Sequence, residues 1–309
     1  MTVHTEILLI AIAVSIACAI PGVFLVLRRM SMMADAITHT VFLGIVLAFF
    51  VTEDLNSPLL LVGATLVGVG TVWLTEMIHN TGLVNEDASI GIIFPLLFSI
   101  AIILVSLYSG NAHLDVDTAL LGEIAFAPFD RWIVNGTDLG PVSLWISLGV
   151  ALINLVLVIL FYKELQLSTF DPLLAGLFGF MPAIIHYVLM TMVSLTVVAS
   201  FQAVGAILVI GLMIGPAVIA YLWTDSVKAM LISSIIIGII CAVIGTEVAF
   251  TLDVSIAGAI ATTIGLALLI AVIGTPKTGY IATYRRQRHL RRHYRETMML
   301  CHIYTHMNT

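Results

Sequence analysis

Long apolar runs, separated by short polar intervals, cover most of this sequence. A membrane-spanning helix needs about 20 mainly apolar residues. Runs of this length lie at 5–27, 31–51, 57–79, 88–108, 142–162, 183–201, 203–223, 227–249 and 255–274. The interval between the sixth and seventh runs, SFQAVG, is only weakly polar, so the pattern also fits eight to ten spans. The sequence predicts an all-α, polytopic bundle of about nine transmembrane helices.

The composition supports an integral membrane protein. Of the 309 residues, 61% are hydrophobic and 10% are charged, whereas a soluble domain carries about 25% charged residues. The three cysteines are too few for a disulfide framework. We therefore expect a multi-pass protein of the plasma membrane.

The basic residues indicate how the bundle is oriented. Cytoplasmic intervals of membrane proteins are enriched in Lys and Arg. With the N-terminus outside, all of the 12 Lys and Arg residues except Arg131 fall on the inner side. The outer intervals are acidic instead, with Glu53, Asp54, Asp115, Asp117, Glu123, Asp130, Asp138 and Asp253. We expect an outside N-terminus and a cytoplasmic C-terminus. The outer acids either concentrate a cation or favour a basic patch on a partner, or they are simply solvated.

Two parts are predicted along the chain. Residues 1–274 form the transmembrane domain, and residues 275–309 form a basic cytoplasmic tail that contains the stretch YRRQRHLRRHYRE. Such a stretch is typical of attachment to anionic membrane lipid.

An Asp and a His interrupt the second apolar run, in the stretch SMMADAITHT. An ionisable side chain at the centre of a membrane helix costs about 2.5–3.5 kcal/mol on insertion scales. Asp35 and His39 are four residues apart, so a helix presents both on one face. A mixed carboxylate and imidazole set suits manganese, zinc or iron(II) better than magnesium or calcium. Two ligands are few, and a second copy across a dimer axis would supply two more. A structural hydrogen bond between helices and a proton relay remain alternatives.

The inner interval KELQLSTFDPLLAGLFGFMP, residues 163–182, predicts a short amphipathic helix at about 168–179. N-cap chemistry is offered by Ser168, Thr169 and Asp171, and Pro172 suits a first turn. Gly179 can end the helix and Pro182 prevents its resumption. An apolar stripe at helical spacing contains Leu173, Leu174, Leu177 and Phe178. Such a helix either lies at the membrane interface or docks into a groove of a soluble partner.

Several separated stretches together resemble one family. They are LRRMSMMADAITHTVFLG (27–44), NEDASIGIIF (85–94), KELQLSTFDPLLAGLFG (163–179) and SFQAVGAILVIGLMIGPAVIAYL (200–222). In order and content they resemble the membrane permease subunit of the manganese/zinc/iron ABC importers. The stretch LDVDTALLGEIAFAPFDRW (114–132) is similar to the manganese-type branch. The likeness extends from about Ile7 to Gly274, and the last 35 residues depart from the compact members.

The resemblance implies roles for particular residues. Asp35 and His39 match the family's D-x-x-x-H, which implies that they are metal ligands in the span that lines the path. Its F-D-x-x-x-A-x-x-x-G pattern implies that a coupling helix seats in an ATPase, and the residues that match it are Phe170, Asp171, Ala175 and Gly179.

The resemblance also implies partners and a mechanism. Such a permease pairs with a second copy or a paralogue, docks two cytoplasmic ATPase subunits, and receives its ion from an extracellular solute-binding protein. The resemblance implies a transport subunit in a bacterial cell membrane, not an enzyme. The sequence has no G-x-x-x-x-G-K-[ST] phosphate loop, and the absence of H-E-x-x-H argues against a membrane metalloprotease. ATP would bind a separate chain, and no nucleic acid partner is expected. The transported ion would be manganese, with zinc and iron as alternatives.

Two rival functions and one minor site stay open. A secondary proton-coupled metal transporter would use Asp35 and His39 as an exchange pair and needs no ATPase. A structural membrane subunit would transport nothing. Glu247 and Asp253 flank the outer end of the eighth span and could form an outer vestibule, while His186 is expected to be a partnered interfacial histidine.

Overall fold

The computed structural model describes residues 2–53, 57–108, 124–134 and 137–275, together with residues 294 and 298. Within these residues, nine helices are long and apolar enough to cross a membrane. They are α1 (Val3–Leu27), α2 (Ser31–Thr52), α3 (Pro58–His79), α4 (Glu86–Tyr108), α6 (Val142–Leu160), α9 (Pro182–Val204), α10 (Ala206–Trp223), α11 (Val227–Leu252) and α12 (Ile256–Gly274). The predicted all-α bundle of about nine spanning helices is confirmed; its orientation in the membrane stays a prediction. Part of the acidic outer stretch and nearly all of the basic tail lie outside the described residues.

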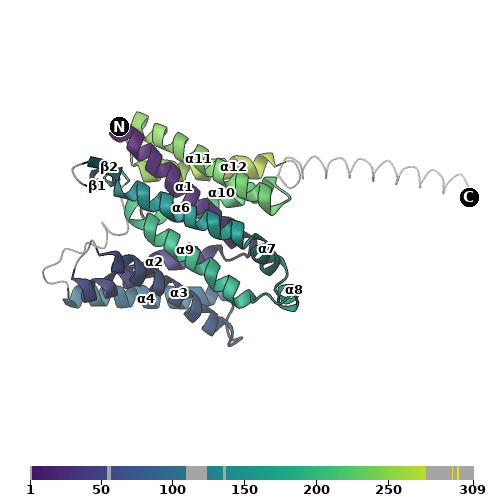
Figure 1. Cartoon of the computed structure of the whole chain (residues 1–309). Helices are drawn as coiled ribbons and strands as arrows, with labels where there is room; N and C mark the ends of the chain where they lie inside the picture. The colour runs from purple at the N-terminus through teal and green to yellow at the C-terminus, as the bar shows by residue number, and fades with distance from the viewer. Residues whose placement is uncertain are drawn as a thin grey trace, which may run out of the picture.

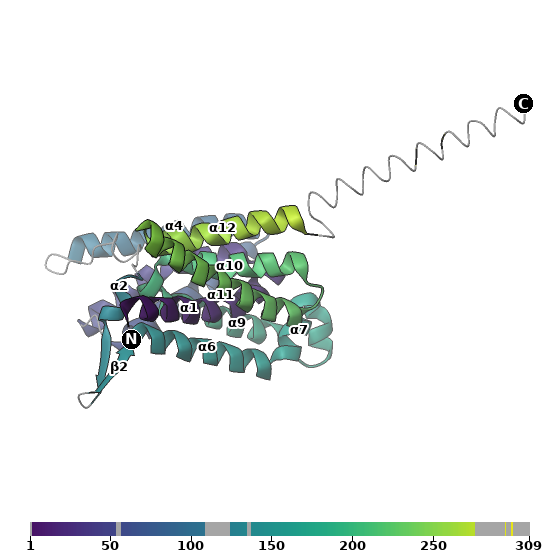
Figure 2. The same ribbon diagram turned by 90° about the horizontal axis from the view of Figure 1, so that it is seen from above.

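In the part of the chain that the structure describes, five short elements connect the spanning helices. A 3-10 turn (Ala127–Phe129) leads into a two-stranded antiparallel hairpin of β1 (Arg131–Val134) and β2 (Thr137–Pro141). Two short helices, α7 (Tyr162–Phe170) and α8 (Pro172–Leu177), follow α6. The hairpin lies beside the N-terminus, and α7 and α8 lie at the opposite end of the bundle (Figures 1 and 2). We call these two ends the hairpin end and the α7–α8 end.

Helix α1 forms the centre of one group of helices. It packs on α6, α9, α10 and α11, while α12 packs on α10 and α11. Most of its side chains are buried, which is why α1 is apolar on every face.

Helix α2 belongs to a second group. It packs on α3, α4 and α9. Helix α9 contacts both groups and lies between them in Figure 1.

Small residues allow the closest helix contacts. A Cβ at Gly22 of α1 would lie 1.9 Å from the carbonyl oxygen of Met213 in α10. A Cβ at Gly44 of α2 would lie 2.5 Å from the Cα of Ala64 in α3. Because lipid is as apolar as a side chain, such backbone approach is a main source of packing energy between membrane helices.

A single glycine separates α9 from α10. Gly205 has φ 78°, a left-handed value that side chains other than glycine adopt at a cost. The weak polar signal in SFQAVG is thus explained, because the chain reorients at one residue and needs no polar loop there.

Candidate functional site

Asp35 and His39 form a pair on α2. His39 Nε2 lies 3.5 Å from Asp35 Oδ1, and the side chains are 28% and 39% exposed respectively. The i, i+4 spacing brings them together as the sequence predicted. Because both side chains stay partly open, the pair can accept a further group.

Aromatic rings of α4 flank His39. The imidazole centroid lies 5.0 Å from the ring of Phe94 and 6.0 Å from the ring of Phe98. These contacts restrict the orientation of His39 and place apolar surface beside the pair. A cation held there would be partly shielded from water, which strengthens its attraction to the carboxylate.

The threonines next to the pair are already used by the helices. Thr38 donates to the carbonyl of Ala34 at 2.7 Å, and Thr40 donates to that of Ala36 at 3.0 Å. Thr40 also lies 2.8 Å from the hydroxyl of Thr71 in α3. Both are buried. Among the residues that the structure describes, no group of three or more His, Cys, Asp and Glu is suited to a metal ion, so the described part of one chain offers this pair alone.

The predicted coupling segment is divided into two helices. Helix α7 continues to Phe170, and Asp171 caps α8 by accepting a hydrogen bond from the amide of Leu174 at 2.9 Å. Gly179, at φ 84°, follows α8 as predicted. The prediction placed one helix at 168–179; α8 itself covers Pro172–Leu177. Sequence analysis missed α7, although YKELQLSTF contains several good helix formers.

The α7–α8 region presents apolar side chains to the outside. Ala175 is buried, whereas Leu173 and Leu177 are each 85% exposed. Phe170 and Phe178 are also exposed and line a groove of about 490 Å³ together with Lys163, Gln166, Leu167 and Phe180. An exposed apolar cluster of this kind is typical of a docking surface.

Arg28, at the C-cap of α1, ties the end of α7 to the bundle. Its Nη2 donates to Ser168 Oγ at 2.7 Å and its Nε donates to Thr169 Oγ1 at 3.1 Å. Two residues expected to cap a helix therefore bind an arginine instead. Burial lowers the pKa of the Arg28 guanidinium from its ordinary value, which still leaves it charged at neutral pH.

The contacts of Arg28 continue into α9 and α3. Its Nη1 lies 3.1 Å from His186 Nδ1. Arginine can only donate, so the ring proton of a neutral His186 is on Nε2, which lies 2.7 Å from Glu76 Oε1. Tyr187 donates to Glu76 Oε2 at 2.6 Å. We call Arg28, Ser168, Thr169, His186, Glu76 and Tyr187 the inner network; sequence analysis identified only His186 as partnered.

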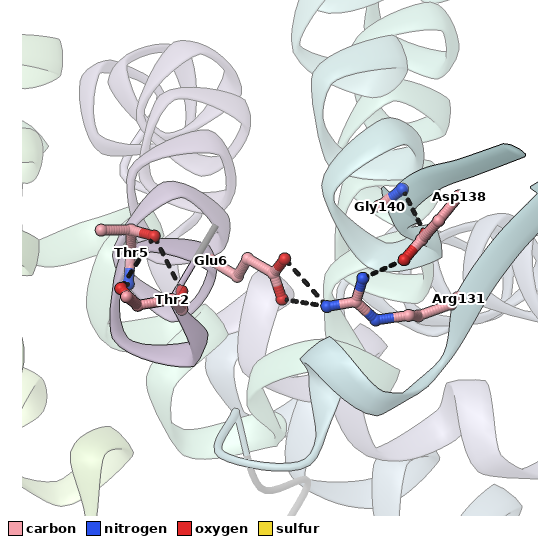
Figure 3. A network of polar contacts seen from close by, with 6 residues as sticks. All are labelled: Thr2, Thr5, Glu6, Arg131, Asp138 and Gly140. Carbon is pink, nitrogen blue, oxygen red and sulfur yellow. Dashed lines mark hydrogen bonds and ion pairs between the residues drawn. The ribbon is translucent and has the colours of Figure 1, made fainter.

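A second network fixes the hairpin to α1 (Figure 3). Glu6 is 4% exposed at its side chain, and its two oxygens lie 2.9 and 2.8 Å from Arg131 Nη2. Arg131 also pairs with Asp138. A hydrogen bond from the Gly140 amide and the Arg131 guanidinium lower the pKa of Asp138. Arg131, the exception in the distribution of basic residues, is thus neutralised by two carboxylates.

The predicted vestibule residues lie in the other group of helices. Glu247 Oε1 of α11 lies 3.4 Å from His4 Nε2 of α1. Asp253 is the exposed C-cap of α11. Helix α11 packs on α1, α10 and α12, whereas the Asp35–His39 pair is on α2, which packs on α3, α4 and α9.

Comparisons with known proteins agree on one family. Residues 2–275 match the ABC 3 transport family. The chain is 44% identical over 281 residues to the manganese transport system membrane protein MntD of Bacillus subtilis (strain 168), covering 91% of this chain and 95% of MntD. It is 45% identical over 305 residues to the zinc transport system membrane protein TroD of Treponema pallidum (strain Nichols), covering 98% and 83%. Among solved structures, PsaBC from Streptococcus pneumoniae in complex with Fab matches with a TM-score of 0.76 and 29% identity, covering 92% of this chain and 96% of that one.

Proposed function

The chain belongs to the ABC 3 transport family, and from this premise we propose that it carries manganese across the membrane, with Asp35 and His39 as the ligands that bind the ion in transit. The observation that carries the proposal is the partly exposed carboxylate–imidazole pair of α2, 3.5 Å apart within a spanning helix. The cost of placing two ionisable groups there is offset when they bind a cation.

Manganese is the ion for which two of three similar proteins are named. MntD and the permease ScaB of Streptococcus gordonii are named for manganese, and TroD is named for zinc. An Asp and a His suit either ion, and intrinsic affinity favours zinc over manganese. Selection for manganese would therefore rest mainly on the solute-binding protein that delivers the ion.

The full site requires a second permease chain. Two ligands leave most of the coordination sphere of a divalent transition metal unfilled. A second copy or a paralogue, packed so that its own pair meets Asp35 and His39, would complete two carboxylates and two imidazoles. Water can occupy remaining positions and allow the ion to leave.

Coupling to ATP hydrolysis would use the α7–α8 end. In this proposal that end is cytoplasmic, and α8 docks an ATPase subunit through Leu173 and Leu177. Phe170 and Asp171 shape the preceding turn, the buried Ala175 packs α8 against the bundle, and Gly179 follows its end at φ 84°. The inner network would transmit movement, because Arg28 binds the end of α7 and reaches Glu76 of α3 through His186. Helix α3 packs along α2, which carries the metal ligands.

The hairpin end would receive the ion from the solute-binding protein. With the N-terminus outside, the hairpin faces that partner, and Glu6 and Arg131 hold it in place. A secondary transporter leaves the exposed surface of α8 without a role. A structural subunit could use that surface for assembly, but it leaves the Asp35–His39 pair without a transport role, so neutralising Asp35 would leave transport intact.

Metal content tests the proposal. A strain that lacks this protein is restored with wild type, Asp35→Asn or Asp87→Asn, and cellular manganese and zinc are measured in metal-poor medium. Asp87→Asn is a matched control, because it removes an exposed carboxylate in the first turn of α4. We expect wild type and the control to restore manganese and Asp35→Asn to fail. Equal restoration by all three contradicts the proposal, and restoration of zinc alone changes the ion.

A further inference from the structure

A groove outside the Asp35–His39 pair opens between α6 and α11. Its volume is about 710 Å³, within the range of small-molecule sites. Both helices pack on α1, and the buried side chain of Ile20 from α1 lies at its floor. We propose that this groove binds one anionic phospholipid, with an acyl chain along its apolar walls and the phosphate beside Lys163 and Lys228.

The walls are built as two matched stripes. On α11 the lining residues are Lys228, Leu231, Ile232 and Ile235. On α6 and the start of α7 they include Leu155, Val158, Ile159, Tyr162 and Lys163. Both sets recur at helical spacing, so each helix turns one face into the groove. In each stripe the apolar residues lie at membrane depth and the lysine lies at the α7–α8 end.

The length of the stripes fits one leaflet. From Lys228 to Ile235 the helix rises about 11 Å. This length covers most of one leaflet of a hydrocarbon core of ~30 Å. Exposed Ile159 and Ile232 lie along the rim, so the groove is open towards lipid. An acyl chain is the apolar group that a bilayer presents to such an open surface.

Charge selects the headgroup. The Lys228 ammonium lies 5.5 Å from the centroid of the Tyr162 ring, a cation–π distance that holds it near α7, where Lys163 follows Tyr162. Glu164 also lines the groove, so two positive charges face one negative charge. Basic pockets at the end of transmembrane helices bind anionic headgroups, whereas a zwitterionic headgroup gains little from this arrangement.

The groove shares a residue with the exposed α7–α8 region. Lys163 lines both this groove and the smaller groove beside Phe170 and Phe178. A bound phospholipid would contact the first turn of α7 and stabilise its position. The proposal does not depend on which ion is transported.

Native mass spectrometry of the purified full-length protein in its assembly tests the site. The probes are palmitoyl-oleoyl phosphatidylglycerol and phosphatidylcholine, which share acyl chains, and glycerol 3-phosphate, which has none. We expect preferential retention of phosphatidylglycerol, a loss of about five-fold in that preference for each of Lys163→Gln and Lys228→Gln, and no retention of glycerol phosphate. Glu164→Gln should strengthen the preference, and Ile235→Trp should reduce retention of both lipids by filling the groove.

Arg29→Gln is the matched control. Arg29 is an exposed arginine at the α7–α8 end that does not line the groove, so its removal should leave the preference unchanged. Equal retention of the two lipids by wild type, or an unchanged preference in the Lys163→Gln/Lys228→Gln double variant, overturns the proposal. Retention of glycerol phosphate would also overturn it, because the groove would then be a site for a soluble phosphate. Exclusion of both lipids from the groove by a protein partner would overturn it as well, because the groove would then be a protein interface.

Discussion

The Asp35–His39 pair and the inner network each place an imidazole beside a carboxylate, but the two are completed differently. In the inner network, Glu76 contacts both His186 and Tyr187, and His186 lies between Glu76 and Arg28. In the pair, the carboxylate and imidazole contact each other at 3.5 Å and are otherwise flanked by phenylalanines. The network satisfies its charges within one chain, whereas the pair stays partly exposed and, in our proposal, leaves coordination positions open for an ion and a second chain.

Removing a charge from the pair should therefore affect transport and not stability. We expect Asp35→Asn to lower manganese uptake by more than about ten-fold, while the melting temperature stays the same or rises, because a costly ionisable group has left the membrane. Uptake of radioactive manganese and thermal unfolding of the purified protein measure the two effects. A fall in both quantities would mean that Asp35 is structural.

Removing a charge from the inner network should lower both stability and uptake. Arg28→Gln leaves Glu76 without its nearby positive charge and Ser168 without its donor, so we expect a loss of about 2–3 kcal/mol in the free energy of unfolding. Uptake should fall with the amount of folded protein and with weaker coupling. Urea unfolding and ATP hydrolysis per assembled transporter separate these contributions.

Tyr187→Phe is the milder control for Arg28→Gln. It removes one hydrogen bond to Glu76 and keeps the ring, so about 1 kcal/mol is expected. Metal binding to Asp35 and His39 should be unchanged in both variants; a large loss of metal binding would show that the network and the pair form one site.

The buried Thr40 tests whether the proposed metal site is limited to Asp35 and His39. Thr40→Val removes a hydroxyl that serves Ala36 and Thr71, at an expected cost of about 1 kcal/mol. Manganese affinity should change by less than about two-fold, because the hydroxyl is already used between helices. A stronger effect on affinity would make Thr40 a third ligand.

The smallest effect concerns the hairpin end and pH. The pKa of Asp138 is lowered in the folded protein by the Gly140 amide and by Arg131. The stabilisation of the hairpin by the Asp138 carboxylate is therefore complete above the ordinary pKa of Asp, and it is lost as the pH falls through the lowered pKa. Limited proteolysis of the hairpin should be slow at pH 6–7 and faster below about pH 4, and Asp138→Asn should remove that dependence. The same pH profile in wild type and in Asp138→Asn would contradict this role of Asp138.

The sequence predicted the features that depend on neighbours along the chain. Nine apolar runs gave the spanning helices, and the four-residue spacing of Asp35 and His39 brought them together on α2. Asp171 was predicted as a cap because its side chain acts on an amide three residues away.

Apart from the local helix α7, the features that were missed depend on residues distant in sequence. Arg28 is separated from His186 by 158 positions, and Glu76 from Tyr187 by 111, so their contacts follow from helix packing alone. Glu6 likewise finds Arg131 only because the hairpin folds back over α1. Ser168 and Thr169 are residue types that often cap helices, but here their hydroxyl oxygens accept hydrogen bonds from the guanidinium of Arg28.

The most direct measurement is manganese binding to the purified transporter, counted as ions per permease chain. The proposal predicts one tightly bound ion for each pair of permease chains, unchanged in Arg28→Gln molecules that remain folded and lost in Asp35→Asn or His39→Ala. A bound ion that survives both Asp35→Asn and His39→Ala would contradict the assignment of these two residues as its ligands.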